Sequence, residues 1–193
     1  MTSRASTSRA STKRSDTLES LIALFKARGF DGASLGALAA ASGLGRASLY
    51  HHFPGGKAEM GRAALAQAGQ RFARLVIAPL ASTAAPRERL LRMIDGIEKF
   101  YADGPLACLT NTMTVGGNEA GFRSAIAASQ QAWLMRMADV FMAALGTGRA
   151  QATARAEALA VAMHGALVLG RVLDDRALFA RTLERLRAEI NDL

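Results

Sequence analysis

Cysteine and aromatic residues are scarce in this chain of 193 residues. Cys108 is the only cysteine, which excludes an internal disulfide and is typical of a reducing compartment. Aromatic residues make up 6% of the chain, whereas alanine is abundant, and this balance favours closely packed helices over a sheet. No clean apolar run approaches the roughly 20 residues of a transmembrane helix, and no segment has a secretory-signal pattern. We therefore expect a cytoplasmic protein with no membrane partner.

Acidic residues are scarce in the first part of the chain. Residues 1–57 hold eight Lys or Arg against three Asp or Glu, a net charge of +5, whereas residues 58–193 hold sixteen against thirteen, a net charge of +3. This uneven distribution indicates a polyanionic partner for the N-terminal part. A generally basic soluble protein is the alternative that charge alone leaves open.

The opening MTSRASTSRASTKR has no acid and, after Met1, no large apolar side chain. It contains TSRAS twice together with four cations, so it has little surface to bury, and we expect a disordered basic arm over residues 1–14. A transit peptide has a similar composition but needs an amphipathic face, which this stretch lacks.

Sustained period-two alternation is absent, and apolar residues recur at helical spacing instead. Ser34 is a predicted N-cap, Gly29 a predicted helix end with Phe30 folded back on Phe25, and Pro86 a predicted first helical residue. The expected helices run from Asp16 to Gly29, over 35–42, about 46–53, about 58–80, from Pro86 to Tyr101, over 106–115, from Asn118 to near Gly146, over about 149–173 and about 176–191. The fold class is therefore all-α.

The stretch GLGRASLYHHFPGGK, residues 43–57, gathers polar and basic side chains that suit several kinds of site. His51 and His52 point about 100° apart on a helix, and the chain has no HExxH or paired CxxC, so we expect no metal site. Ser48 and His52 are four residues apart, yet no Asp or Glu lies among residues 32–58 to orient a base. Since a Gly-rich phosphate loop is also missing, we expect no enzyme and no cofactor.

The same stretch fits a helix-turn-helix, in which two short helices flank a glycine turn. Ala39 lets the helices cross closely, and Gly43 supplies the positive φ of the turn. Arg46 and its neighbours then lie at the N-terminal end of the second helix, the part that enters a major groove. The predicted shared core consists of Leu38, Leu44 and Leu49.

The segment SLGALAAASGLGRASLYHHFPGGKAEM, preceded by a helix ending in RGF, resembles the DNA-binding domain of TetR-family repressors over about residues 15–60. The family usually has two residues between its Phe and Lys, whereas three separate Phe53 from Lys57, so Lys57 is expected at a different phosphate. FPGGK, GPLACL and HGALVLGRVLDD resemble the LmrA/YxaF-like branch. The resemblance implies DNA contacts at Ser34, Arg46, Ala47, Ser48, Tyr50, His52 and Lys57.

The resemblance also implies a ligand-responsive transcriptional repressor. It would have a basic arm (1–14), a helix-turn-helix domain (15–57) and a regulatory domain for ligand binding and dimerisation (58–193). As a homodimer it would bind a palindromic operator in double-stranded DNA, and a small, largely apolar inducer would release it. The alternative is a helical small-molecule-binding protein whose helix-turn-helix is only structural.

Two further sites are expected in the regulatory domain. Small residues at Ala156, Ala160, Ala166 and Gly170, with Phe179, Leu183, Leu186 and Ile190, suit a four-helix dimer interface. Large flat side chains and flexible methionines suit an aromatic ligand. The candidate ligand residues are Phe100, Met113, Trp133, Met137, Phe141 and His164. A purely structural role for Trp133 and His164 stays open, as does a core or a redox role for Cys108.

Overall fold

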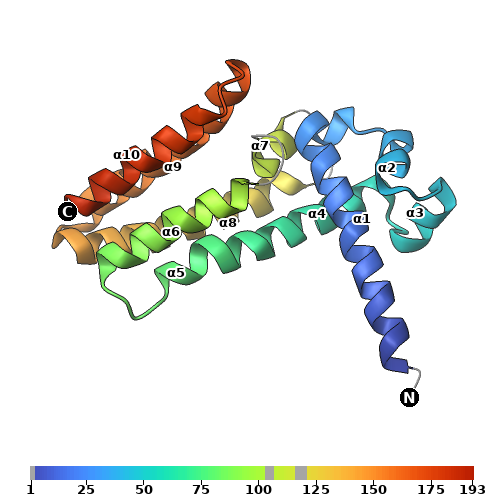
Figure 1. The fold of residues 1–193 in the computed structure, drawn as a ribbon, viewed down its shortest axis with the longest axis horizontal. Helices are drawn as coiled ribbons and strands as arrows, with labels where there is room; N and C mark the ends of the chain where they lie inside the picture. Colours follow the sequence, from blue (N-terminus) through green and yellow to red (C-terminus); the bar gives the residue numbers. More distant parts are fainter. Residues whose placement is uncertain (1–2, 103–106, 116–120) are drawn as a thin grey trace. The chain divides into compact units, whose positions relative to one another are not determined.

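The computed structural model of the chain describes residues 3–102, 107–115 and 121–193, with side chains from Ser15 onward. Every regular element in these ranges is helical and none is a strand, which confirms the all-α prediction (Figure 1). The elements are α1 (Ser3–Gly32), α2 (Leu35–Ser42), α3 (Arg46–His52), α4 (Gly56–Phe72), the π-helix η1 (Ala73–Ile77), α5 (Ala78–Leu80), α6 (Pro86–Tyr101), α7 (Leu109–Thr114), α8 (Phe122–Leu145), α9 (Arg149–Val172) and α10 (Ala177–Asn191).

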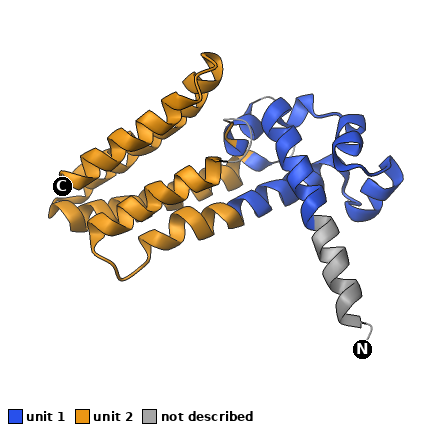
Figure 2. Cartoon of the chain, in the orientation of Figure 1, with its two compact units in different colours: residues 1–69, 109–122 blue, residues 70–108, 123–193 orange. Residues whose placement is uncertain are grey.

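The chain folds as two compact units, shown in different colours in Figure 2. Unit 1 comprises residues 1–69 and 109–122, which include α1, α2, α3, α7 and most of α4. Unit 2 comprises residues 70–108 and 123–193 and contains the remaining helices. The expected domain boundaries stay a prediction.

The end of the first helical stretch follows the sequence prediction. Gly29 has a φ of 68°, which glycine adopts without strain, and the Phe30 ring stacks on Phe25 with 6.0 Å between centroids. Gly29 is also a point of close contact with α7, because a Cβ there would lie 2.9 Å from the carbonyl oxygen of Thr112. The glycine thus serves both the turn and the packing of α7 on α1.

The start of α1 differs from the prediction. The backbone is helical from Ser3, whereas the sequence predicts a disordered arm over residues 1–14 and a helix from Asp16. Extending an existing helix needs no new nucleus, and the Ser, Ala, Arg and Lys residues of the arm do not break a helix. The side chains of residues 1–14 lie outside the described part of the structure.

The helix predicted over 58–80 is present but widens near its C-terminal end. Its last turns form η1, in which the amide of Ala78 donates to the carbonyl of Ala73. Pro79 provides the reason: a proline ring clashes with the carbonyl four residues earlier, here Leu75, and cannot donate to it. A π-turn moves that carbonyl aside and lets the chain remain helical.

The displaced carbonyl points at α6. A Cβ built on Gly96 would lie 1.9 Å from the Leu75 oxygen and 2.6 Å from its carbon, so only glycine fits there. α6 otherwise buries an apolar stripe that includes Leu90, Ile94 and Ile97. The close contact between α6 and η1 therefore requires glycine, which has no side chain, at position 96.

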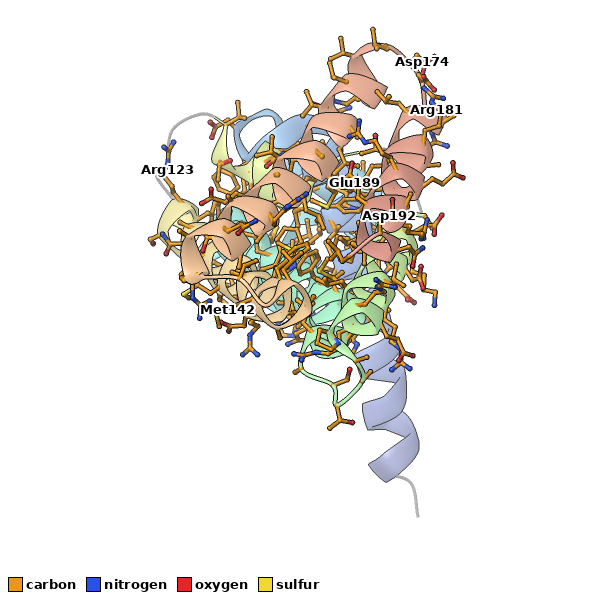
Figure 3. The ribbon with its side chains drawn as sticks, turned by 90° about the vertical axis from the view of Figure 1, so that its left-hand side faces the viewer. Arg123, Met142, Asp174, Arg181, Glu189 and Asp192 are labelled. Atoms are coloured by element: carbon orange, nitrogen blue, oxygen red, sulfur yellow. The ribbon has the colours of Figure 1, made fainter. Side chains whose placement is uncertain are left out.

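Asp174 and Asp175 lie in the turn between α9 and α10, where Figure 3 labels Asp174 near Arg181. Asp174 has a φ of 51°. Asp175 accepts from the Leu178 amide at 3.1 Å and pairs with Arg181 at 2.7 Å. The hydrogen bond from Arg181 holds the pKa of Asp175 below its ordinary value. Together these bonds fix the start of α10.

Helix α9 is apolar on two opposite faces. One face enters the core of unit 2 with Ala152, Ala156, Leu159 and Met163. The opposite face, here called the outer face of α9, carries Ala158, Val161, Gly165, Val168, Leu169 and Val172, all exposed except Gly165, which is partly buried. By length and composition alone this helix is long and apolar enough to cross a membrane. Over a stretch of 18 of its residues the mean hydropathy is 1.2, and 39% of that stretch is buried in the structure. A helix that is buried in a protein core and has a second apolar face can have the same length and hydropathy.

The predicted dimer residues require a correction. Ala156, Ala160, Ala166 and Gly170 on α9 and Phe179, Leu183, Leu186 and Ile190 on α10 are all buried within the chain itself. Most of them join the core in which α10 packs on α9 and α6. Small residues at helical spacing permit close approach of any helix, so the sequence could not distinguish a neighbour in the same chain from a partner chain.

We predict that Gly96→Ala destabilises unit 2 by about 1–3 kcal/mol or more, because the new methyl group would overlap the Leu75 carbonyl. Gly69→Ala is the matched control, since Gly69 is helical and no atom lies within 4 Å of its missing Cβ. That control should stabilise the chain by about 0.5–1 kcal/mol through helix propensity. Urea unfolding measures both, and equal effects of the two substitutions would contradict the close contact.

Candidate nucleic-acid interface

The helix-turn-helix of unit 1 has the local geometry that its sequence predicts. The Ser34 Oγ accepts from the amide of Ala37 at 3.2 Å and caps α2. Gly43 ends α2 in the left-handed region, with φ 67° and ψ 12°, and no side chain obstructs it. Of the predicted shared core, Leu38 and Leu49 are buried, whereas Leu44 is only partly buried. The turn and the core thus fix where α3 begins.

The start of α3 is presented to solvent. Arg46, Ala47 and Ser48 are exposed in its first turn, and Tyr50 is 46% exposed further along. Residues 32–58 include no acidic residue, so α2, α3 and the turn between them carry no negative side chain. A short exposed helix of this composition can enter a groove of DNA without burying a carboxylate.

Arg46 lies beside the start of α2. Its Nη2 atom is 3.2 Å from the position that a Cβ on Gly36 would occupy. A larger residue at position 36 would therefore displace the guanidinium. Gly36 leaves room for Arg46 at the exposed end of both helices.

Tyr50 and the histidines occupy the other end of α3. The Cε1 atom of Tyr50 would lie 3.6 Å from a Cβ on Gly56, so the ring borders the turn before α4. His51 and His52 are both exposed, with 5.7 Å between ring centroids. No group of three or more His, Cys, Asp or Glu suited to a metal ion occurs among the described residues.

Lys57 is held against the end of α1. Its Nζ donates to the carbonyl oxygen of Asp31 at 3.4 Å and lies 4.5 Å from the centroid of the Phe30 ring. Glu59 accepts from the amide of Gly55 at 2.7 Å and thereby closes the extra-residue turn. The lengthened turn thus places Lys57 on α1, and a DNA contact from it stays a prediction.

The candidate ligand residues are divided between the two units. Met113 belongs to unit 1, where its Cε is 3.1 Å from the missing Cβ of Gly61. The other five belong to unit 2: Phe100, Trp133, Met137, Phe141 and His164. The structure brings these five into one region of the core, with Phe100 and His164 partly buried.

Phe72 links the aromatic members of this group. Its ring centroid lies 5.3 Å from that of Phe100 and 5.3 Å from that of Trp133, both edge-on. Trp133 in turn lies 6.3 Å from the ring of His164. The indole N–H of Trp133 is buried and has no acceptor among the described residues. A buried donor costs free energy unless a water or another polar group accepts from it.

Cys108 connects two titratable groups in the same core. Its thiol forms hydrogen bonds with Tyr101 and with His164. Burial raises the pKa of Tyr101 well above its ordinary value, and Cys108 adds to this. For His164, burial lowers the pKa, but the hydrogen bond and charge of Cys108, together with the hydrogen bond to the Ala160 carbonyl, leave the pKa raised. The sequence does not predict this group, because His164 lies far along the chain from Tyr101 and Cys108.

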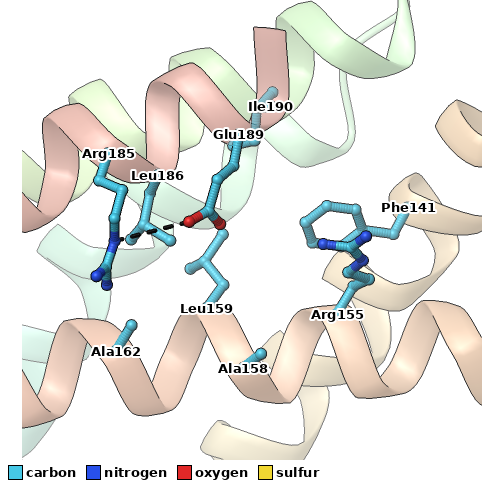
Figure 4. Close-up of a pocket in the computed structure, with 9 residues that line it drawn as sticks. All are labelled: Phe141, Arg155, Ala158, Leu159, Ala162, Arg185, Leu186, Glu189 and Ile190. Atoms are coloured by element: carbon cyan, nitrogen blue, oxygen red, sulfur yellow. Dashed lines mark ion pairs between the residues drawn. The ribbon is translucent and has the colours of Figure 1, made fainter. Parts of the chain in front are cut away.

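A separate pocket of about 210 Å³ lies among α8, α9 and α10 (Figure 4). Of the candidate ligand residues only Phe141 lines it. Leu159, Leu186 and Ile190 contribute apolar surface, and Arg185 pairs with Glu189 at 3.6 Å. The remaining lining residues are Arg155, Ala158 and Ala162, of which Ala158 belongs to the outer face of α9.

Comparison with known proteins identifies the helix-turn-helix. Residues 18–64 match the family model for bacterial regulatory proteins of the tetR family. No curated protein matches the sequence.

Solved structures share the fold over nearly the whole chain. SCO4454, a TetR-family transcriptional regulator from Streptomyces coelicolor, has a TM-score of 0.76 at 20% identity and covers 94% of this chain and 96% of its own. The regulatory protein TetR from Rhodobacter sphaeroides has a TM-score of 0.71 at 20% identity over 92% and 96%. A TetR-family regulator from Agrobacterium tumefaciens has a TM-score of 0.67 at 22% identity over 93% and 97%.

Proposed function

We propose that this chain, which has a tetR-family DNA-binding domain at residues 18–64 and the TetR-regulator fold over nearly its whole length, binds an operator and represses transcription. The observation that carries the proposal is the exposed start of α3, held by a capped helix and a left-handed glycine turn. Geometry of this kind places side chains in a major groove. The basic N-terminal arm would add contacts to the phosphate backbone.

Arg46 is the side chain best placed to read a base. It is the one long cation in the first turn of α3, and Gly36 leaves it room. A guanidinium can donate two hydrogen bonds to the edge of guanine. Ser34, Ala47, Ser48, Tyr50, His52 and Lys57 would line the same interface, most of them towards phosphates.

Dimerisation would use the outer face of α9. Val161 is 71% exposed, Val172 is 70% exposed and Leu169 is 52% exposed. An exposed apolar face of this extent is typical of a surface that binds another protein. A second copy would lay the same face against it across a two-fold axis, which matches a palindromic operator. Two α3 helices would then be placed about 34–36 Å apart, one turn of the duplex.

A ligand in the core of unit 2 would control this spacing. The aromatic group of Phe72, Phe100, Trp133 and His164 suits a flat, largely apolar molecule with a polar acceptor for the Trp133 N–H. Such a ligand releases DNA only if it binds the non-operator conformation more tightly. α4 passes from unit 1 into unit 2 along the chain and would transmit the change. The resemblance of FPGGK, GPLACL and HGALVLGRVLDD to the LmrA/YxaF-like branch also suggests a flat, largely apolar ligand.

We expect Arg46→Ala to weaken operator binding by about 1–3 kcal/mol and to relax base preference at one position of each half-site. Tyr50→Phe and Lys57→Ala are the controls and should weaken specific and random DNA alike. The measurement is a binding titration against an operator enriched from random DNA by the parent protein. An equal loss on specific and random DNA for Arg46→Ala would exclude base reading.

The double variant Val161→Asp, Leu169→Asp should shift the protein from dimer to monomer. Each substitution places a carboxylate in the proposed apolar contact and acts twice across the symmetry axis. We expect the dissociation constant of the dimer to rise by at least about 100-fold. Val115→Asp is the matched control, because Val115 is 75% exposed in unit 1. Sedimentation measures both, and a dimer that survives the double variant would move the interface elsewhere.

Trp133 provides an optical test of the ligand site, since it is the only tryptophan of the chain. A compound that releases DNA should change the Trp133 emission at the same concentration. Trp133→Phe should raise the releasing concentration and leave a folded, DNA-binding dimer. If that variant responds like the parent protein, Trp133 belongs only to the core.

A further inference from the structure

We propose that Cys108 is a nucleophile that adds to small α,β-unsaturated carbonyl compounds, with His164 as its base and Trp133 as the donor to the carbonyl oxygen. The inference rests on the proposed function in one respect: it makes this class of compound the inducer. Three observations carry it, and they come from different side chains of unit 2.

The first observation is the orientation of His164. Its Nδ1 lies 2.8 Å from the carbonyl oxygen of Ala160. A carbonyl only accepts, so Nδ1 carries the hydrogen and donates. In the neutral ring Nε2 therefore has the free lone pair, and it is the atom available for the hydrogen bond with Cys108. The backbone thus fixes the tautomer that can take a thiol proton.

The second observation is the arrangement around the sulfur. Cys108 forms hydrogen bonds with both His164 and Tyr101, in a core that is otherwise apolar. A phenol hydroxyl donates to a thiolate, and an imidazolium beside it balances its charge. The raised pKa of His164 agrees with this pairing. A nucleophile, a base and a backbone group that orients the base are the parts that an activated cysteine needs.

The third observation is the unsatisfied indole of Trp133. Its ring lies 6.3 Å from that of His164, and its buried N–H lacks an acceptor in the described chain. A carbonyl oxygen beside the reacting carbon would accept from it. The same donor would stabilise the negative charge that develops on that oxygen during addition.

The addition balances without an oxidant. The Cys108 proton moves to Nε2 of His164, and the thiolate forms a bond to the β-carbon of the enone. The π electrons of the C=C bond shift to the carbonyl oxygen as an enolate, which accepts from Trp133. His164 then returns the proton to the α-carbon, and the product is a thioether. The adduct disrupts the hydrogen bonds through which Cys108 joins α6 to α9.

The test uses the full chain, in which Cys108 is the only thiol. Methyl vinyl ketone is added at pH 7, and intact mass follows a single adduct in native protein and in protein unfolded in urea. We expect the native chain to react at least about 10-fold faster than the unfolded chain, since only the native thiol has its base. A merely buried cysteine reacts more slowly when native, and that result would overturn the proposal.

Two variants assign the roles. His164→Gln should lower the native rate by at least about 10-fold, and an unchanged rate would remove His164 as the base. Trp133→Phe should slow methyl vinyl ketone but not methyl methanethiosulfonate, a thiol reagent without a carbonyl group. Equal slowing of both reagents would show loss of packing instead of a lost donor, and would overturn the role of Trp133.

Operator binding separates this proposal from the proposed function. If the unmodified protein does not bind DNA, the repressor function is rejected, but intact mass still measures the reactivity of Cys108. Protein that binds DNA and keeps its affinity once the adduct has formed would reject this class of compound as the inducer. Loss of DNA affinity in step with adduct formation, absent in Cys108→Ser, is the result that we expect.

Discussion

The apolar character of α9 on both of its faces is the constraint on which unit 2 depends. Its inner face, with residues at alternating spacings of three and four, joins the core to which α6, α8 and α10 also contribute. Its outer face leaves Val161, Leu169 and Val172 exposed to water. The same helix thus contributes to the core of the unit and carries the apolar face that is proposed for dimerisation.

Much of the fold can be predicted from short-range sequence features, namely the residues that end helices and the spacing of apolar side chains. Ser34, Gly43 and Pro86 each fix a helix end through the chemistry of one residue, and each lies where it was expected. The spacing of apolar residues predicts which side chains are buried on α6 and α8. The helix-turn-helix was predictable for the same reason: its turn, cap and core are set within a short segment.

Other features depend on contacts between distant parts of the chain, and the sequence did not reveal them. The sequence predicts a dimer interface on the face of α9 that is buried within the chain, since alanine and glycine permit close packing against a helix of the same chain or of a partner chain. The group of Tyr101, Cys108 and His164 forms only when α6, α9 and the segment before α7 come together. The contacts of the Lys57 amine with the Asp31 carbonyl and the Phe30 ring also join residues that lie far apart in the sequence.

The π-turn at η1 joins two positions that look unrelated in the sequence. Pro79 displaces the Leu75 carbonyl, and Gly96 on α6 leaves the space that the carbonyl enters. If Pro79 is exchanged for a residue with an amide hydrogen, the helix can close to its regular form and the carbonyl withdraws. The requirement for glycine at position 96 then weakens. The two positions should therefore vary together during evolution, and their substitutions should be strongly non-additive.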